Sequence, residues 1–241
     1  MSTPRLVDLT LPLTPGQRGV SMEPKYTFEP HGWNAATWHL YSHAGTHMDT
    51  QIHSAAGPET IDTKPLALCL GPAVVVDLTP VAPGTLLTVA HLGPVATTFI
   101  DGESLLLRTD WHLHAANPAI YRDGLPRISD ELAAWCVARR VKILGVEPPS
   151  IADVNHLPEV IRIHQLLLRG GVTIVEGLAH LDQLTHPRVF FHALPLKLAG
   201  GDGCPVRAFA YDSPPDTWPR PDPSAHAAQA VPTSPALSPR P

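Results

Sequence analysis

Four side chains that can bind a metal ion lie within eleven residues of this sequence: His43, His47, Asp49 and His53. Imidazole and carboxylate ligands together suit Zn²⁺, Mn²⁺ or Fe²⁺ better than Mg²⁺ or Ca²⁺, which prefer oxygen ligands alone. Residues two apart in an extended segment point to the same side, so we expect His47 and Asp49 to face one ion. The spacing therefore predicts a divalent metal site.

Other residues of this run are expected to shape the site. Gly45 allows a tight backbone turn, which can bring His43 back towards the ion. The Thr46 hydroxyl is expected to hold a ligand, through either the second nitrogen of a histidine or a carboxylate. His53 lies four residues beyond Asp49, near enough to reach the same pocket.

A second pair of candidate ligands lies far along the chain. His164 shares the apolar face of a predicted helix over residues 158–169, and Glu176 closes a predicted strand over residues 172–176. A Gly-Gly turn joins this helix to the strand, so both side chains could reach one end of a sheet. A hydrogen-bonded core histidine and a solvated glutamate are the alternatives, and spacing alone leaves the choice open.

Apolar runs rich in β-branched residues recur along the chain and predict a mixed α/β fold with more strands than helices. The predicted strands cover residues 5–9, 38–42, 73–78, 104–109, 142–146, 172–176, 189–194 and 206–211. One helix is expected to begin after Ser129, a suitable N-cap, and to end at the basic pair Arg139 and Arg140. The second is the helix over residues 158–169, which Gly170 should stop.

Composition limits the classes of function. The chain has 241 residues, 44% hydrophobic and 16% charged, which is enough for a sizeable core and excludes a wholly disordered chain. Its net charge of −5 argues against nucleic acid or an anionic membrane surface as the main partner. The three cysteines are far apart, so neither a disulfide framework nor a cysteine zinc site is expected. Because the N-terminus lacks the pattern of a secretory signal, we predict a cytoplasmic protein.

Residues 1–211 are predicted to form one domain and residues 212–241 a flexible, proline-rich tail. The tail has few large apolar side chains, so its folding would bury too little surface to offset the cost of ordering. A proline-rich ligand for another protein is the alternative role for this segment.

The run from His43 to His53 resembles the signature H-x-G-T-H-x-D-x-P-x-H of the metal-dependent cyclase-like hydrolases. That family contains bacterial kynurenine formamidase and isatin hydrolase. Gln51 stands where the signature has proline. Further segments resemble the family in the same order, at residues 70–78, 107–111, 143–150, 164–168, 174–178, 195–198 and 201–207. The resemblance extends over about residues 5–211.

The resemblance implies a set of metal ligands: His43, His47, Asp49, His164 and Glu176. The first three would hold one ion, and Asp49 would bridge to a second ion held by the last two. The metal would be Zn or Mn, with one or two ions per chain. His53 would donate and accept the proton in catalysis. The implied fold is a swivelling β/β/α domain with a partly open central barrel, in homodimers or homotetramers whose neighbouring subunit helps to wall the site.

Aromatic and apolar residues before the metal run are candidates for binding a small-molecule substrate. Trp33 and Trp38 flank the run in sequence, and Met22 lies in a segment that, by resemblance, covers the substrate. Ordinary core packing is the alternative for each tryptophan. Kynurenine formamidases usually have Trp or Phe before Pro-Gly in this segment, whereas this chain has Gly-Val-Ser-Met-Glu-Pro at residues 19–24.

Together these features predict a hydrolase that cleaves an amide or cyclic amide with a metal-activated water, similar to an arylformamidase or an isatin hydrolase. A lactone or ester hydrolase is one alternative. A cyclase or lyase that acts through an enolate is another, and a non-catalytic small-molecule binding protein is the third.

Overall fold

The computed structural model describes residues 5–218, and an eight-stranded sheet lies at its centre. The strand order is β1-β12-β11-β5-β7-β9-β10-β4, and β4 also pairs with β12. The strands are β1 Arg5–Asp8, β4 His47–Asp49, β5 Leu70–Asp77, β7 Ser104–Arg108, β9 Ile143–Val146, β10 Thr173–Glu176, β11 Arg188–Pro195 and β12 Gly203–Asp212. Seven strands therefore form a ring, with β1 attached outside it.

The ring closes through a short seam between β4 and β12. Gly203, Cys204 and Pro205 of β12 pair with β4, whereas the rest of β12 pairs with β11 and β1. The strands β5, β7, β9 and β10 run parallel to one another, and the other pairings are antiparallel. This sheet confirms the expected mixed α/β class with a partly open central barrel.

Two hydrophobic cores follow from the alternation of side chains along the strands. In β7, Leu106 belongs to the core inside the barrel, while Leu105 and Leu107 belong to the core between the barrel and the helices. In β10, Val175 belongs to the core inside the barrel and Ile174 to the core between the barrel and the helices. The parallel strands are thus apolar on both faces, which explains why they read as continuous apolar runs.

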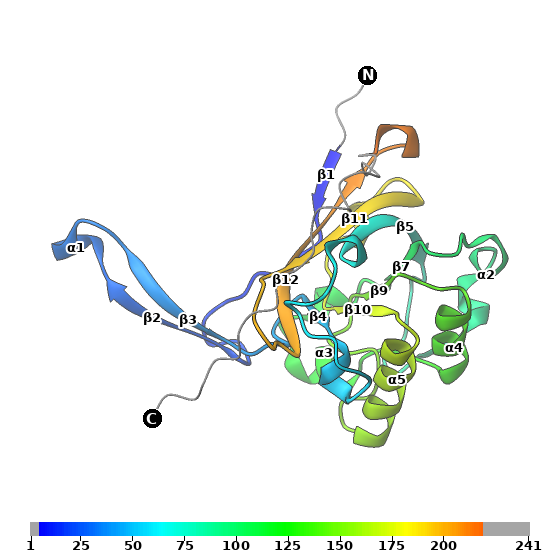
Figure 1. The fold of residues 1–241 in the computed structure, drawn as a ribbon, viewed down its shortest axis with the longest axis horizontal. Coiled ribbons are helices and arrows are strands. Elements are labelled where there is room, and N and C mark those ends of the chain that lie inside the picture. Colours follow the sequence, from blue (N-terminus) through cyan, green and yellow to red (C-terminus); the bar gives the residue numbers. More distant parts are fainter. Residues whose placement is uncertain (1–4, 219–241) are drawn as a thin grey trace.

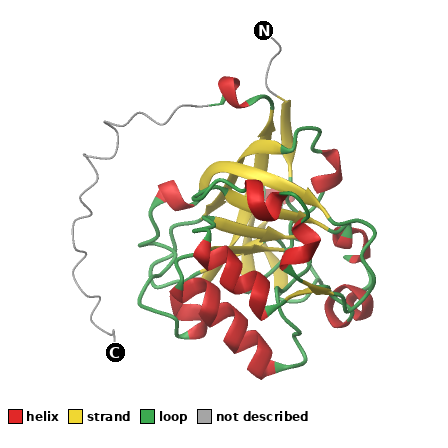
Figure 2. Ribbon diagram, turned by 90° about the vertical axis from the view of Figure 1, so that its right-hand side faces the viewer, coloured by secondary structure: helices red, strands yellow, loops and turns green. Residues whose placement is uncertain are grey.

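The two longest helices, α4 Asp130–Ala138 and α5 Leu157–Arg169, pack together against one side of the barrel (Figures 1 and 2). Both confirm the predicted helices: the Ser129 hydroxyl accepts a hydrogen bond from the Leu132 amide, and Gly170 ends α5. The remaining elements are α1 Phe28–His31, α2 Val95–Thr98, α3 Pro118–Asp123, β6 Leu86–Leu87, β8 Arg127–Ile128, η1 Gln51–Ser54, η2 Leu66–Leu68, η3 Val89–Leu92, η4 Trp111–His114, η5 Leu181–Gln183 and η6 Pro215–Thr217.

A hairpin of β2 Val20–Tyr26 and β3 Ala35–Leu40 projects from the body, with α1 at its tip (Figure 1). We call residues 20–40 the arm. Within the described chain, β2 and β3 pair only with each other. The arm exposes several large apolar side chains to solvent: Met22, Tyr26, Phe28, Trp33, Trp38 and Leu40.

The folded body extends past the predicted start of the tail. Asp212 is the last residue of β12, and its side chain is 1% exposed. The Trp218 indole donates a hydrogen bond to the carbonyl of Ser213. The sheet thus includes the first residue of the predicted tail, and residues 219–241 of that tail lie outside the described residues. No helix within residues 5–218 has the length and apolar character needed to cross a bilayer.

Candidate metal centre

The strand β4 holds two of the predicted ligands on one face. His47 lies opposite Glu176 of β10 and Pro205 of β12, so both neighbours fix its position. Met48 points into the barrel core, and His47 and Asp49 therefore point the other way. The side chains of His47 and Asp49 are almost fully buried.

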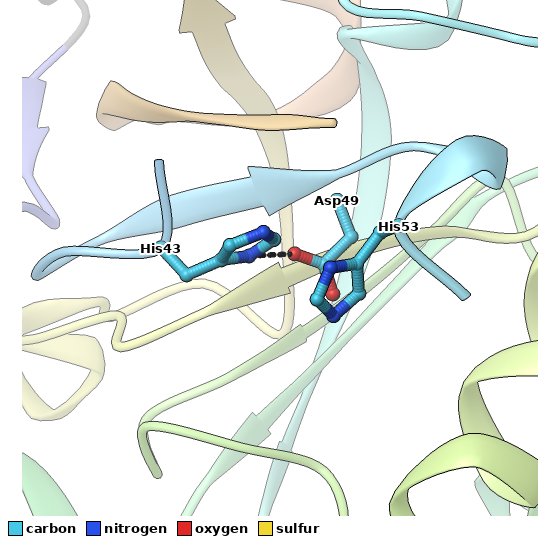
Figure 3. Close-up of side chains that lie close together, drawn as sticks. All are labelled: His43, Asp49 and His53. Atoms are coloured by element: carbon cyan, nitrogen blue, oxygen red, sulfur yellow. Dashed lines mark hydrogen bonds and ion pairs between the residues drawn. The ribbon is translucent and has the colours of Figure 1, made fainter. Parts of the chain in front are cut away.

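The turn before β4 brings His43 to the same place. Gly45 has a φ of 61°, and a Cβ on it would lie 2.6 Å from Cδ2 of Leu13. Only glycine suits this conformation and this space. As a result, Nδ1 of His43 lies 2.8 Å from Oδ1 of Asp49 (Figure 3).

Two histidines present the same ring nitrogen to the site. The Nδ1–H of His47 donates to the Gly45 carbonyl at 2.9 Å, and the Nδ1–H of His164 donates to the Val160 carbonyl at 2.7 Å. Each bond leaves Nε2 directed at Glu176, at 3.2 Å from His47 and 3.4 Å from His164. Metal-binding histidines are typically fixed in this way, with one nitrogen held by a carbonyl and the other free.

The weaker sequence signal from His164 and Glu176 thus belongs to the same cluster as the run at residues 43–53. The helix α5 places Nε2 of His164 at 3.5 Å from Oδ2 of Asp49. Glu176 ends β10, and its Oε1 also accepts the backbone amide of Ile151 at 2.8 Å. The structure brings all five predicted ligands together.

The chemistry of these donors fits a divalent ion. Oδ2 of Asp49 is buried and has no hydrogen-bond partner among residues 5–218. A buried carboxylate oxygen without a donor is costly, and a cation would satisfy it. At this site, candidate donor atoms within 4.8 Å of one another form two groups, His43–Asp49–His53 and His47–Asp49–Glu176. Because both groups contain Asp49, the geometry accommodates one ion or two bridged ions.

Protons balance the buried carboxylates when no ion is present. Burial alone lowers the pKa of His43, but hydrogen bonds and charges from Asp49 and Asp202 outweigh it and raise the pKa to about 9. Against the same effect of burial, Glu176 and Asp49 raise the pKa of His164 to about 9. Despite burial, the histidines hold the pKa of Glu176 well below its usual range. An ion must displace these protons, so binding should release them to solvent.

His53 differs from the ligand histidines in exposure and charge. It lies in η1 with its side chain 26% exposed, and its ring centre is 4.0 Å from that of His43 (Figure 3). Burial lowers its pKa, and the positive charges of His43 and His164 add to this and outweigh the pull of Asp49. A neutral imidazole at the edge of the site can accept a proton near pH 7.

Comparison with known proteins agrees with this geometry. The family model named Cyclase matches residues 7–153, which is more than half of the chain. The chain belongs to the Cyclase family. The kynurenine formamidase of Salinibacter ruber is 31% identical over 186 residues, which cover 75% of this chain and 81% of that protein.

Solved structures share the fold of this Cyclase-family chain. Isatin hydrolase A from Labrenzia aggregata, bound to benzyl benzoate, superposes with a TM-score of 0.74 at 25% identity and covers 86% of this chain and 93% of its own. Isatin hydrolase A from Ralstonia solanacearum gives a TM-score of 0.74 at 28% identity, with coverages of 86% and 91%.

One acidic residue of the Cyclase-family site was missed from the sequence. Oδ2 of Asp202 lies 2.9 Å from Nε2 of His43 and 3.8 Å from Nδ1 of His53, and it also accepts the Ser42 hydroxyl. Its signal was an acid flanked by glycines, Gly201 and Gly203, directly before a strand. Burial opposes the shift, but the hydrogen bond from His43 lowers the pKa of Asp202.

The expected role of Thr46 is wrong in this Cyclase-family chain. Its hydroxyl accepts the backbone amide of Leu11 and donates to the carbonyl of Gly177, so it joins the N-terminal segment to the turn after β10. Its one proton is used by Gly177, and the second nitrogens of His47 and His164 bond to backbone carbonyls instead of to Thr46.

The predicted substrate-binding residues do not meet the metal centre within one chain. Met22, Trp33 and Trp38 lie on the arm, exposed by 36%, 53% and 48% (Figure 1). The hairpin holds them away from the body of their own chain, so their predicted role in substrate binding stays a prediction. Trp111 is 1% exposed and donates its indole N–H to the Tyr121 carbonyl, so it is a core residue.

Proposed function

We propose that this protein hydrolyses an amide or cyclic amide with a metal-activated water. The observation that carries this proposal is the convergence of four donor side chains on the buried carboxylate of Asp49, whose Oδ2 has no hydrogen bond among residues 5–218, beside His53 with its lowered pKa. Kynurenine formamidase and isatin hydrolase relatives support a carbon–nitrogen bond outside a peptide as the target.

The residues of the site have two functions in hydrolysis: most of them hold the metal, and one moves a proton. A bound divalent ion supplies hydroxide near neutral pH and polarises a carbonyl. His43, His47 and His164 would hold it together with Asp49 and Glu176. His53 takes the proton of the attacking water and delivers it to the departing nitrogen.

Asp202 positions His53 in this scheme. Its carboxylate faces Nδ1 of His53 at 3.8 Å, so a small movement of either side chain makes a hydrogen bond. That bond would place the proton on Nδ1 and leave Nε2 free to accept one.

The metal is proposed to be Zn or Mn, as one ion or as two ions that share Asp49. Mixed imidazole and carboxylate donors support either metal. Elemental analysis of protein purified without a histidine tag gives the identity and the number of ions per chain. Activity that persists after complete removal of metal would overturn the proposal.

The arm is proposed to complete the metal site of a neighbouring copy in a homodimer or homotetramer. In one chain the exposed Met22, Trp33 and Trp38 contact no substrate site of their own, yet apolar side chains in such number are unusual on a monomer surface. On a partner they would provide an apolar wall beside the metal.

Mixing two inactive variants tests this arrangement. The first is H53A, which keeps the arm; the second replaces residues 22–38 by a short Gly-Ser turn and keeps His53. If the arm works on a neighbour, refolding the two together restores activity, because some assemblies pair an intact arm with an intact site. Activity no higher than the sum of the separate variants would exclude the shared site.

A substrate screen with and without chelator tests the reaction itself. N-formylkynurenine represents aryl formamides, isatin represents cyclic amides, and simple lactones represent esters. Hydrolysis of one of the two amides, lost with chelator and restored by Zn²⁺ or Mn²⁺, is the expected outcome. Turnover of lactones alone would favour the lactonase alternative.

Labelled water separates hydrolysis from the remaining alternatives. A hydrolase incorporates one ¹⁸O atom from water into the carboxylate product. A cyclase or lyase that acts through an enolate forms product without this label. A non-catalytic binding protein would bind the substrates and convert none of them.

The domain and compartment are part of the same proposal. The described body supports one hydrolase domain that runs to at least Trp218 rather than ending at residue 211. The three cysteines are buried and unpaired, which supports a reducing compartment such as the cytoplasm.

A further inference from the structure

A second group of metal-binding side chains lies where parallel strands end, outside the metal centre. His112 is in η4 after β7, and His180 and Asp182 lie in the segment that follows β10. Donor atoms of these three residues lie within 4.8 Å of one another. The strands β7, β9 and β10 are parallel neighbours, so their carboxyl ends meet at one edge of the sheet.

Glu147, directly after β9, fixes the ring of His112. Its Oε1 lies 2.9 Å from Nδ1 of His112, and its Oε2 accepts the amides of Thr109 and Trp111 and the Thr109 hydroxyl. Glu147 is fully buried, so these bonds hold it rigidly. Burial lowers the pKa of His112, but the hydrogen bond and charge of Glu147 outweigh it and raise the pKa, so an ion must displace a proton from Nε2 while Nδ1–H stays on the carboxylate. A carboxylate behind a histidine is the usual support of a metal ligand.

The other two donors lie near that nitrogen, on its solvent side. The His180 ring centre is 5.0 Å from that of His112, and Oδ1 of Asp182 is 3.9 Å from Nε2 of His112. The side chain of Asp182 is 43% exposed, so an ion can enter from water. His180 has a φ of 58°, a backbone conformation that histidine tolerates better than most residues.

Among residues 5–218, no lysine or arginine forms an ion pair with Asp182. Arg108 is near enough for its charge to act on Asp182, but its guanidinium is bound to Asp77 at 2.7 Å and to Asp110 at 2.8 Å and 3.1 Å. Among the ion pairs of residues 5–218, Asp182 appears only with His112. Its charge therefore faces two imidazoles, which is a ligand set for a metal of the zinc class.

We propose that His112, His180 and Asp182 bind one transition-metal ion of the zinc class, with water in the remaining position. Ligand atoms around tetrahedral Zn²⁺ lie roughly 3.4 Å apart, so the observed separations need only small side-chain rotations. The ion would join the turn after β7 to the segment that begins four residues beyond Glu176. This site does not depend on the proposed hydrolase activity.

Removing ligands from each site separately tests the proposal. The first variant, H43A/H47A, disables the metal centre and is expected to keep one Zn²⁺ per chain. Adding H180N and D182N should lower the affinity for that remaining Zn²⁺ by at least about tenfold. The affinity is measured by competition with a chelator on protein without a histidine tag. Asparagine tolerates the left-handed backbone at position 180, so H180N removes the ligand without adding backbone strain.

Controls separate a true site from loss of folding and from chance binding. H114N alters a histidine of the same turn that lies outside the group, and it should leave Zn²⁺ affinity unchanged. In chelator, adding H180N and D182N should leave the melting temperature of H43A/H47A unchanged, and H114N should melt with the natural protein. If H43A/H47A does not fold, H180N/D182N in the natural background should lose one ion per chain by elemental analysis. Unchanged metal content and affinity after H180N/D182N would overturn the proposal and leave His112 and Glu147 as a buried ion pair.

Discussion

At the scale of single residues, the metal centre combines histidines set against buried carboxylates, which are the proposed ligands, with one histidine that exchanges a proton. His43 and His164 sit against buried carboxylates, which raise the pKa of each to about 9. His53 is more exposed and has a lowered pKa. The same side-chain type therefore has two proposed roles, metal ligand and proton carrier, and burial together with neighbouring charges sets the pKa in each.

Replacing His53 should abolish turnover and spare the metal. H53A is expected to lower kcat by about 10²–10⁴-fold, because it removes general acid–base catalysis. Its metal content, from elemental analysis, should equal that of the natural protein. H114A is the matched control and should remain active. Full activity of H53A would remove it from the mechanism.

Replacing His47 should instead empty the metal centre. H47A removes an Nε2 that faces Glu176 at 3.2 Å and leaves that buried carboxylate with one imidazole fewer. We expect at least one ion per chain to be lost relative to the natural protein, with activity falling in parallel. A metal content equal to that of the natural protein would contradict the ligand role.

The metal ligands could be predicted from the sequence, whereas the residues that position them could not. His47 and Asp49 could be identified because several residues that can bind metal lie close together in the sequence. Close spacing along a strand implies closeness in space. Asp202 was missed since it reaches His43 across 159 positions, which only the sheet reveals. Thr46 was assigned wrongly because a hydroxyl beside ligands has the same sequence signal whether it contacts them or the backbone.

At the scale of elements, the turn after β10 decides where Glu176 lies. Gly177 has a φ of 67°, and a Cβ on it would lie 2.5 Å from the carbonyl oxygen of Gly45. That carbonyl also accepts the Nδ1–H of His47. Two glycine turns therefore pack against each other behind the metal centre, and neither can accept a side chain.

Gly177→Ala should disturb the site more than an equivalent change elsewhere. Gly84 has a φ of 71° but open space around its Cβ position, so G84A pays only the backbone cost of about 1–2 kcal/mol. G177A should be less stable than G84A in urea denaturation and should also bind Zn²⁺ more weakly. Equal stability and equal affinity would show that the close approach does not matter.

Elements with an apolar pattern were predicted and others were missed. Seven of the eight predicted strands and both long helices have apolar faces that the cores require, so their apolar pattern indicates them; the eighth, over residues 38–42, overlaps β3 of the arm. The sequence of β2, with Glu23, Pro24 and Lys25 in succession, has no such face, because the arm packs against nothing in its own chain. The strand β4 is only three residues long, too short for a period to be recognised.

At the scale of the whole molecule, the C-terminal end of the sheet ties together three distant segments. The Asp212 carboxylate accepts hydrogen bonds from Arg5, Thr185 and His186. Burial raises its pKa, but the hydrogen bonds led by that of His186 outweigh it and bring the pKa to about 2. A tail prediction based on proline content could not reveal this, since Asp212 itself looks like any polar residue before a proline run.

Asp212 should contribute to stability above about pH 4 and lose that contribution in acid. Its folded pKa of about 2 lies below the ordinary 3.8, so the contribution disappears as the pH falls from about 4 to about 2. The shift corresponds to about 2 kcal/mol. D212N should therefore lower the free energy of unfolding at pH 7 and flatten its decline between pH 4 and pH 2, measured by urea denaturation. An unchanged acid profile would contradict this.

The strand that closes the barrel is also the strand that carries His47 and Asp49. Only three residues of β12 join β4 on that side, and the carboxylates behind the seam need a cation or bound protons to balance them. A cation bound there would join the two edges of the barrel as well as activate water, so stripping the metal should lower the resistance of the whole fold to denaturant.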